Sequence, residues 1–168
     1  MNTLLFILAY YIVWFGSLIL AAAQLPWIAF LLSISMSLAQ LIFLCDLSQI
    51  QKTWKKFFLC LTFIGFSVDS VLCFSSYIHF EANPWQPYLA PPWILGIWIS
   101  FSVLCIGIST VIQQLSNYLW IIALMGFPAA YLVGVSFNAA VFVHGTSSSL
   151  LLGFIWMLLF PLVCRSTL

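Results

Sequence analysis

The sequence predicts an all-α, polytopic transmembrane bundle of about six helices, which forms a single integral membrane domain over residues 1–168. The first observation is composition: four residues are Lys or Arg and three are Asp or Glu, whereas 65% are hydrophobic. Because a soluble domain carries about a quarter of charged residues, these few charges cannot cover a water-exposed surface. The second observation is that the apolar residues fall in segments of roughly 20, the length that crosses about 30 Å of hydrocarbon.

The predicted helices follow one another with short connections. No Lys or Arg precedes the first apolar segment, and this segment is longer than the apolar core of a signal peptide. We therefore expect a retained helix rather than a leader cleaved after residues 21–23. The last helix is short at its start and can begin earlier, in the serines at 147–149. The six predicted helices cover residues 4–23, 26–45, 57–78, 93–113, 119–142 and 150–164.

The positions of the basic residues predict the orientation. Lys52, Lys55 and Lys56 lie between the second and third helices, and Arg165 follows the sixth. Basic residues in short loops stay on the cytoplasmic side, so both termini are expected to be cytoplasmic. The lysine loop is a candidate docking site for a cytoplasmic partner or for anionic headgroups. The alternative is that the three lysines only keep this loop on the cytoplasmic side.

Several function classes leave no trace in the sequence. The five cysteines include no Cys-x-x-Cys pair, which argues against a thiol oxidoreductase. Phosphate-binding glycine loops, hydrolase and zinc-protease motifs, and basic nucleic-acid-binding patches are also missing. His79, Glu81 and His144 do not have the spacing of a metal motif. We therefore expect no catalytic motif, no cofactor, no metal and no nucleic-acid partner.

Asp69 is the residue that stands out. It lies 12 residues into the third predicted helix, which at 1.5 Å per residue is about 18 Å and close to the middle of the bilayer. A carboxylate there costs several kcal/mol, so it should face the bundle interior as a protonated carboxyl or one held by hydroxyl donors. Its role is either structural or in ligand or proton binding. Residues at matching depth that can form a polar layer with it are Ser17, Ser33, Ser100, Ser102 and Tyr131.

A stripe of small residues marks the fifth predicted helix. Gly126, Ala130 and Gly134 recur every four residues, and Asn138 continues the series. Small residues at this spacing let two membrane helices approach closely. Pro128 is expected to bend the same helix. The stripe therefore predicts a helix-packing seam.

Short motifs along nearly the whole chain resemble a bacterial inner-membrane family catalogued as domain of unknown function 2878. They are WFG at 14–16, LPW at 25–27, VDS at 68–70, APPWIL at 90–95, GFPAAYLVG at 126–134 and WMLLFP at 156–161. Phe127 stands where the family pattern has a second glycine. The resemblance implies a multi-pass protein of the bacterial cytoplasmic membrane. It supplies no catalytic residues, and it implies a link to enzymes that modify fatty-acyl chains.

Three functions are consistent with these features. The first is a non-enzymatic accessory or scaffold component linked to membrane lipid modification or envelope maintenance, whose partners are the bilayer and a membrane or cytoplasmic protein. The second is a small-molecule or lipid binding or transport subunit in which Asp69 lines a pocket, by analogy with other compact six-helix bundles. The third is a membrane-embedded lipid-modifying enzyme. The sequence favours a protein that is not an enzyme, because it shows no paired acid and base. A pocket inside the bundle would distinguish the second function from the first.

Overall fold

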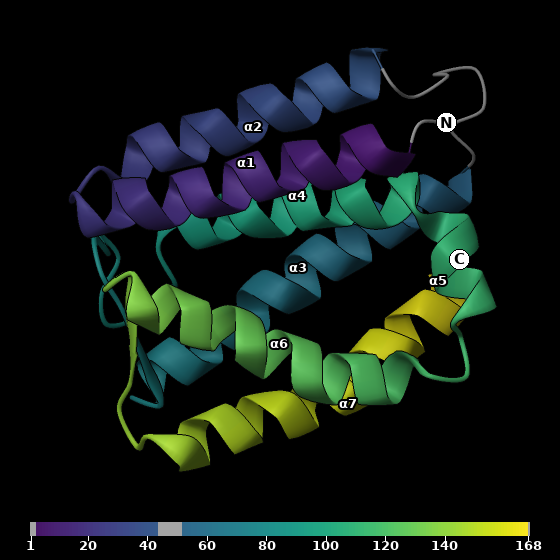
Figure 1. Ribbon diagram of the computed structural model, residues 1–168. Helices are drawn as coiled ribbons and strands as arrows, with labels where there is room; N and C mark the ends of the chain where they lie inside the picture. The colour runs from purple at the N-terminus through teal and green to yellow at the C-terminus, as the bar shows by residue number, and fades with distance from the viewer. Residues whose placement is uncertain (1–2, 44–51, 168) are drawn as a thin grey trace.

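The computed structural model describes residues 3–43 and 52–167, which form an all-α membrane bundle with one small sheet (Figure 1). Five helices in these ranges are long and apolar enough to cross a membrane. The predicted fold class is therefore confirmed. The elements are α1 (Thr3–Ala22), α2 (Pro26–Phe43), α3 (Lys52–Phe74), β1 (Ile78–Phe80), α4 (Pro92–Gly107), α5 (Ser109–Gln114), α6 (Leu119–Ser136), β2 (Ala140–Phe142) and α7 (Thr146–Thr167).

The fourth predicted helix is divided into α4 and α5. The break falls at Ile108, whose φ of −113° and ψ of 20° lie outside the helical range. At 16 residues, α4 extends for about 24 Å, which is shorter than the hydrocarbon layer. Twelve of its residues are buried, because α4 packs against α1, α2 and α3. It is the central helix of this part of the bundle.

The ends of three predicted helices are corrected by the structure. Residue 78 and residues 140–142 were expected to be helical, but they form β1 and β2, which pair antiparallel with Ile78 opposite Phe142. Ser76 and Asn138 adopt positive φ angles of 58° and 56°, which end α3 and α6 before the strands. Asn138 therefore does not continue the helical stripe of small residues. At its start, α7 includes the serines at 147–149.

The bundle has two distinct ends. One, here called the sheet end, carries β1, β2 and the short connection between α1 and α2; the other, the terminal end, carries the start of α1 and the end of α7 (Figure 1). Lys52, Lys55 and Lys56 belong to the first turns of α3 at the terminal end, rather than to a loop as predicted. The rest of the predicted basic loop, residues 44–51, lies outside the described residues. Arg165 is exposed in the last turn of α7 at the same end.

The helices form two groups. In the first, α1, α2, α3 and α4 pack together, and in the second α6 packs on α7; α3 also contacts α7 and links the two groups. The two helices of the second group approach closely at Gly153 of α7, where a Cβ would lie 2.9 Å from the Leu124 carbonyl oxygen and 3.0 Å from Pro128. Both of these neighbours belong to α6, so α6 meets α7 beside its internal proline.

The predicted seam on α6 is not such a contact. A Cβ on Gly126 would have no atom within 4 Å, and one on Gly134 would meet only Leu18, at 3.6 Å. Gly126, Ala130 and Gly134 instead line a cavity between the two groups of helices. Sequence periodicity identified a special face of α6, which borders open space at Gly126 and meets Leu18 of α1 only at Gly134.

Candidate functional site

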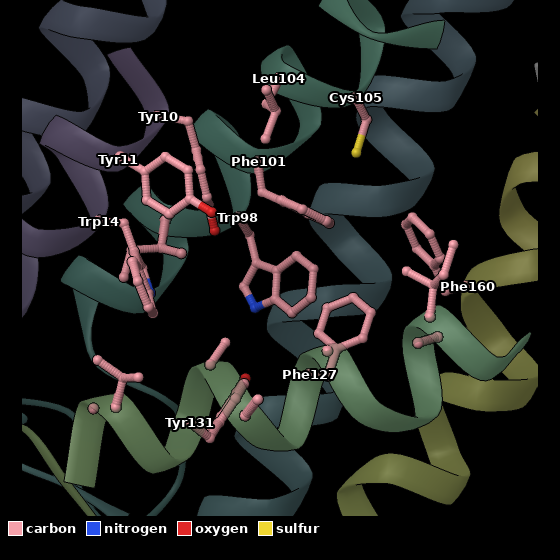
Figure 2. Close-up of a pocket in the computed structure, with 18 of the residues that line it drawn as sticks. Tyr10, Tyr11, Trp14, Trp98, Phe101, Leu104, Cys105, Phe127, Tyr131 and Phe160 are labelled. Atoms are coloured by element: carbon pink, nitrogen blue, oxygen red, sulfur yellow. The ribbon is translucent and has the colours of Figure 1, made fainter. Parts of the chain in front are cut away.

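A cavity of about 620 Å³ lies between α1, α4 and α6 (Figure 2). Its walls are almost entirely apolar and aromatic, and α5 closes one end. None of the described residues that line it is a Lys, Arg or His. This volume falls within the range of roughly 300–1,000 Å³ that is typical of sites for small molecules.

The cavity is elongated along the bundle. On α6 its lining extends from Leu119 to Gly134, which corresponds to about 22 Å of helix. This is most of the roughly 30 Å of hydrocarbon in a bilayer. A molecule that fills the cavity is therefore a long one, and it lies roughly parallel to the helices.

The cavity opens sideways between α1 and α6. Lining residues at its rim remain accessible from outside: Tyr11 is 48% exposed, Leu115 40% and Ile122 44%. Tyr11 and Ile122 belong to α1 and α6, two of the helices that are long and apolar enough to cross a membrane. The opening therefore lies along the length of these helices.

The wall formed by α6 is shaped by small residues. Gly126, Ala129, Ala130 and Gly134 all line the cavity, and the space above Gly126 is open. Larger side chains at these positions would project into the volume. The stripe that the sequence predicted as a seam thus keeps the cavity wide.

Asp69 lies at the wall of this cavity and is 0% exposed. The indole Nε1 of Trp98 donates a hydrogen bond to its Oδ2 at 2.7 Å, and the hydroxyl of Tyr131 donates to its Oδ1 at 2.5 Å. These three residues come from α3, α4 and α6 respectively. The carboxyl therefore joins helices of both groups across one end of the cavity.

Asp69 lies nearer to one end of its helix than the sequence predicted. Because α3 begins at Lys52 and ends at Phe74, Asp69 lies five residues from the sheet end of its helix, or about 7.5 Å. The predicted distance to this end was longer because the predicted helix continued to residue 78.

The predicted serines do not surround Asp69. Ser17 and Ser33 are 3.3 Å apart at the contact between α1 and α2. Ser102 shares a hydrogen bond of 2.9 Å with Thr62 and donates to the Trp98 carbonyl oxygen. The Ser100 hydroxyl is buried without a partner among the described residues. Serine hydroxyls in helices usually bond to local carbonyl groups, and this explains why they are used in packing rather than in one polar layer.

Trp98 was missed by the sequence reasoning, which considered hydroxyl groups as donors for Asp69. The indole is held by aromatic stacking, with its ring 4.7 Å from Trp156, which in turn lies 4.5 Å from Phe127. A Cβ on Gly65 would overlap the Trp98 ring, so this glycine makes room for it. Trp98 lies six residues into α4, a depth similar to that of Asp69, and a search that included indole N–H donors would have found it.

The polar residues at the sheet end form a separate and more exposed group. Nε2 of His79 lies 4.0 Å from Oε1 of Glu81, and Gln24 donates to the same carboxylate at 3.5 Å. His144 packs instead against the ring of Tyr77. Within the described ranges, no three His, Cys, Asp or Glu side chains gather in a geometry that suits a metal ion. The cavity is therefore the better candidate for a functional site.

Comparison with known proteins identifies a family but no function. No curated protein and no solved structure matches the chain. The family described as a protein of unknown function, DUF2878, matches residues 3–162, which include every residue that lines the cavity. Because this match covers nearly the whole chain, the protein belongs to the DUF2878 family.

Proposed function

We propose that this protein binds a long-chain, lipid-like molecule that enters the cavity from the bilayer. The observation that carries the proposal is an elongated, apolar cavity of about 620 Å³ that opens between α1 and α6. A protein that acts only as a scaffold has no need of such a space in its core. The proposal thus favours the binding function over the scaffold that the sequence ranked first.

Binding is also favoured over catalysis. Both oxygens of Asp69 accept hydrogen bonds, and the side chain has no exposed surface. General acid–base chemistry needs a tuned group within reach of the reacting atoms and usually a second group beside it. None of the described residues lining the cavity supplies a Lys, Arg or His for that role.

The role that we assign is that of a non-enzymatic accessory protein of the bacterial cytoplasmic membrane. Holding one lipid apart from the bulk bilayer suits a component of membrane lipid modification or envelope maintenance. This assignment is supported by the resemblance to an inner-membrane family, and the cavity provides its physical basis.

The test is to identify what the purified protein retains. The full-length protein is extracted in polymer nanodiscs, transferred to mild detergent and analysed by native mass spectrometry and lipid extraction. We expect one lipid class in near-stoichiometric amount and enriched over its share of the membrane. A retained lipid fraction that mirrors the bulk membrane would overturn the proposal.

Two substitutions on neighbouring residues locate the binding. Gly126→Phe projects a ring into open cavity space, whereas Met125→Phe changes a lipid-facing residue that is 66% exposed and does not line the cavity. We expect the first variant to lose most of the retained lipid and the second to keep it. Equal retention by both variants, with unchanged thermal stability, would show that the lipid binds elsewhere.

A further inference from the structure

Three side chains on α1 that line the cavity carry a polar atom with no hydrogen-bond partner among the described residues. They are Tyr10, Tyr11 and Trp14, which lie within about one turn of each other. Among the residues that the structure describes, neither tyrosine hydroxyl nor the Trp14 indole N–H takes part in a hydrogen bond. Figure 2 shows Tyr10 and Tyr11 directed from α1 toward the middle of the cavity, on the side opposite Tyr131.

The rings that carry these groups are fixed by packing. Tyr10 lies 5.6 Å from the ring of Phe101, Tyr11 lies 6.0 Å from that of Trp14, and Trp14 lies 4.8 Å from Phe15. The donors are therefore presented at defined positions. In hydrocarbon no water is available to satisfy them, so a ligand that offers an acceptor atom there gains binding free energy.

Hydrogen bonding matters more here than apolar burial. A chain that moves from the bilayer into the cavity exchanges one apolar environment for another and gains little from the hydrophobic effect. Selection of one lipid over the bulk must therefore come from shape and from polar contacts. The unpaired donors on α1 are the described groups that are placed to make such contacts.

The charge of the site restricts the ligand. An anionic headgroup would find no basic side chain among the described lining residues. For a cationic headgroup, Asp69 is the only acidic partner among the described lining residues, and it has no exposed surface and already accepts bonds from Trp98 and Tyr131. A charge of either sign is costly in this environment without a counter-charge. The ligand group that meets α1 is therefore uncharged.

The depth of the donors excludes a group that stays at the headgroup level. Tyr11 is 11 residues from the end of α1 at Ala22, which places it about 16 Å from the sheet end. This is near the middle of the bilayer. The polar group of the ligand is thus small enough to lie inside the cavity together with the hydrocarbon chain of the same ligand.

We infer that the cavity selects an uncharged long-chain lipid whose hydroxyl or carbonyl oxygen accepts hydrogen bonds from Tyr10, Tyr11 and Trp14. This inference rests on the proposed function, because it names the class of lipid that the same cavity takes. It makes α1 the element that determines specificity. Asp69, Trp98 and Tyr131 then hold the far wall in place rather than contact the polar group.

The experiment compares probes that share one chain. The full-length protein in phospholipid nanodiscs is photolabelled with a diazirine derivative of hexadecanol, and the labelled peptides are identified by mass spectrometry. Hexadecanol, hexadecane, hexadecyl phosphate and hexadecyltrimethylammonium are the competitors, at equal mole fraction in the bilayer. We expect hexadecanol to compete best, about fivefold to tenfold better than hexadecane, as one net hydrogen bond provides.

Substitutions connect this preference to α1. Tyr10→Phe combined with Tyr11→Phe keeps the rings and removes both hydroxyls, so competition by hexadecanol should weaken by about fivefold to tenfold, while hexadecane is unaffected. Tyr118→Phe, at an exposed tyrosine outside the cavity, is the control and should change neither. A preference that persists in the double variant would overturn the assignment to α1.

The outcomes separate this inference from the proposed function. Saturable labelling with equal competition by all four probes, or with strongest competition by a charged one, overturns the inference and leaves lipid binding in the cavity intact. Labelling that is not saturable and does not change in Gly126→Phe overturns the proposed function, and the inference falls with it.

Discussion

At the residue scale, Asp69 is held by two donors that come from different helices. Trp98 of α4 and Tyr131 of α6 each bond to one of its oxygens, at 2.7 and 2.5 Å. Because the cavity separates α4 from much of α6, these bonds connect the two groups of helices where packing is sparse. The carboxyl thereby compensates for contacts that the cavity removes.

The bond between Asp69 and Tyr131 can be measured with a double-mutant cycle. Asp69→Leu leaves both donors without an acceptor, whereas Tyr131→Phe removes only a hydroxyl. We expect a coupling free energy of roughly 1–2 kcal/mol in equilibrium unfolding in detergent, the value of a buried hydrogen bond to a charged or polar acceptor. Additive effects of the two substitutions would contradict the bond.

Asp69→Asn separates a structural role of this side chain from one that needs its charge. The amide oxygen can still accept from Trp98, and the amide N–H can donate to the Tyr131 hydroxyl. We therefore expect Asp69→Asn to fold with near wild-type yield and to retain its lipid, whereas Asp69→Leu folds with lower yield and unfolds at a lower temperature. Size-exclusion profiles and lipid extraction report both properties. A folded Asn variant without lipid would mean that an ionised carboxyl takes part in binding.

At the element scale, α6 uses two faces in different ways. One face packs on α7 at Gly153, beside Leu124 and Pro128, and the other borders the cavity through Gly126 and its neighbours. At the first face, Gly153 of α7 allows the two helices to pack closely. At the second face, Gly126 of α6 leaves the cavity open. The two uses respond differently to the addition of a single methyl group.

A matched pair of Gly→Ala substitutions tests this difference. Gly153→Ala places a Cβ 2.9 Å from a backbone oxygen that cannot move freely, so we expect a loss of about 1–3 kcal/mol of stability. Gly126→Ala meets no atom within 4 Å and should be neutral or gain up to about 1 kcal/mol from helix propensity. Thermal unfolding of both variants in detergent gives the comparison. Destabilisation by Gly126→Ala would contradict the open space beside Gly126.

The same elements show what the sequence could predict. Hydropathy located every long helix, because length and apolar composition are set by the bilayer. It extended α3 and α6 into β1 and β2, because short apolar strings have the same composition in a strand as in a helix end. The stripe on α6 was visible as a period of four, but a period does not tell what lies opposite it. The cavity depends on the placement of α1, which no local pattern encodes.

Only part of the polar site around Asp69 could be predicted, because sequence patterns do not give tertiary packing. The free-energy cost of placing a carboxyl group inside a membrane helix identified Asp69. Its predicted depth along the helix, matched on the other helices, identified Tyr131, which does bond to it. The same depth argument also selected Ser17, Ser33, Ser100 and Ser102, which are buried elsewhere in the bundle. Depth fixes one coordinate of a residue, whereas the direction of its side chain around the helix depends on tertiary packing.

At the scale of the whole molecule, the arrangement of the ends determines how the protein lies in the membrane. The start of α1 and the end of α7 are at one end of the bundle (Figure 1), together with Lys55, Lys56 and Arg165. The sheet end carries His79 and Glu81 but none of the four Lys and Arg residues of the sequence. This distribution is strongly asymmetric for a chain with so few charges.

Since basic residues near membrane helices are retained on the cytoplasmic side, we expect the terminal end to be cytoplasmic. In a bacterial host, a fluorescent protein fused after residue 168 should fluoresce, and alkaline phosphatase fused there should be inactive. Alkaline phosphatase fused after Asn83, in the connection at the sheet end, should be active. The opposite pattern at both positions would show the reverse orientation, with the sheet end on the cytoplasmic side.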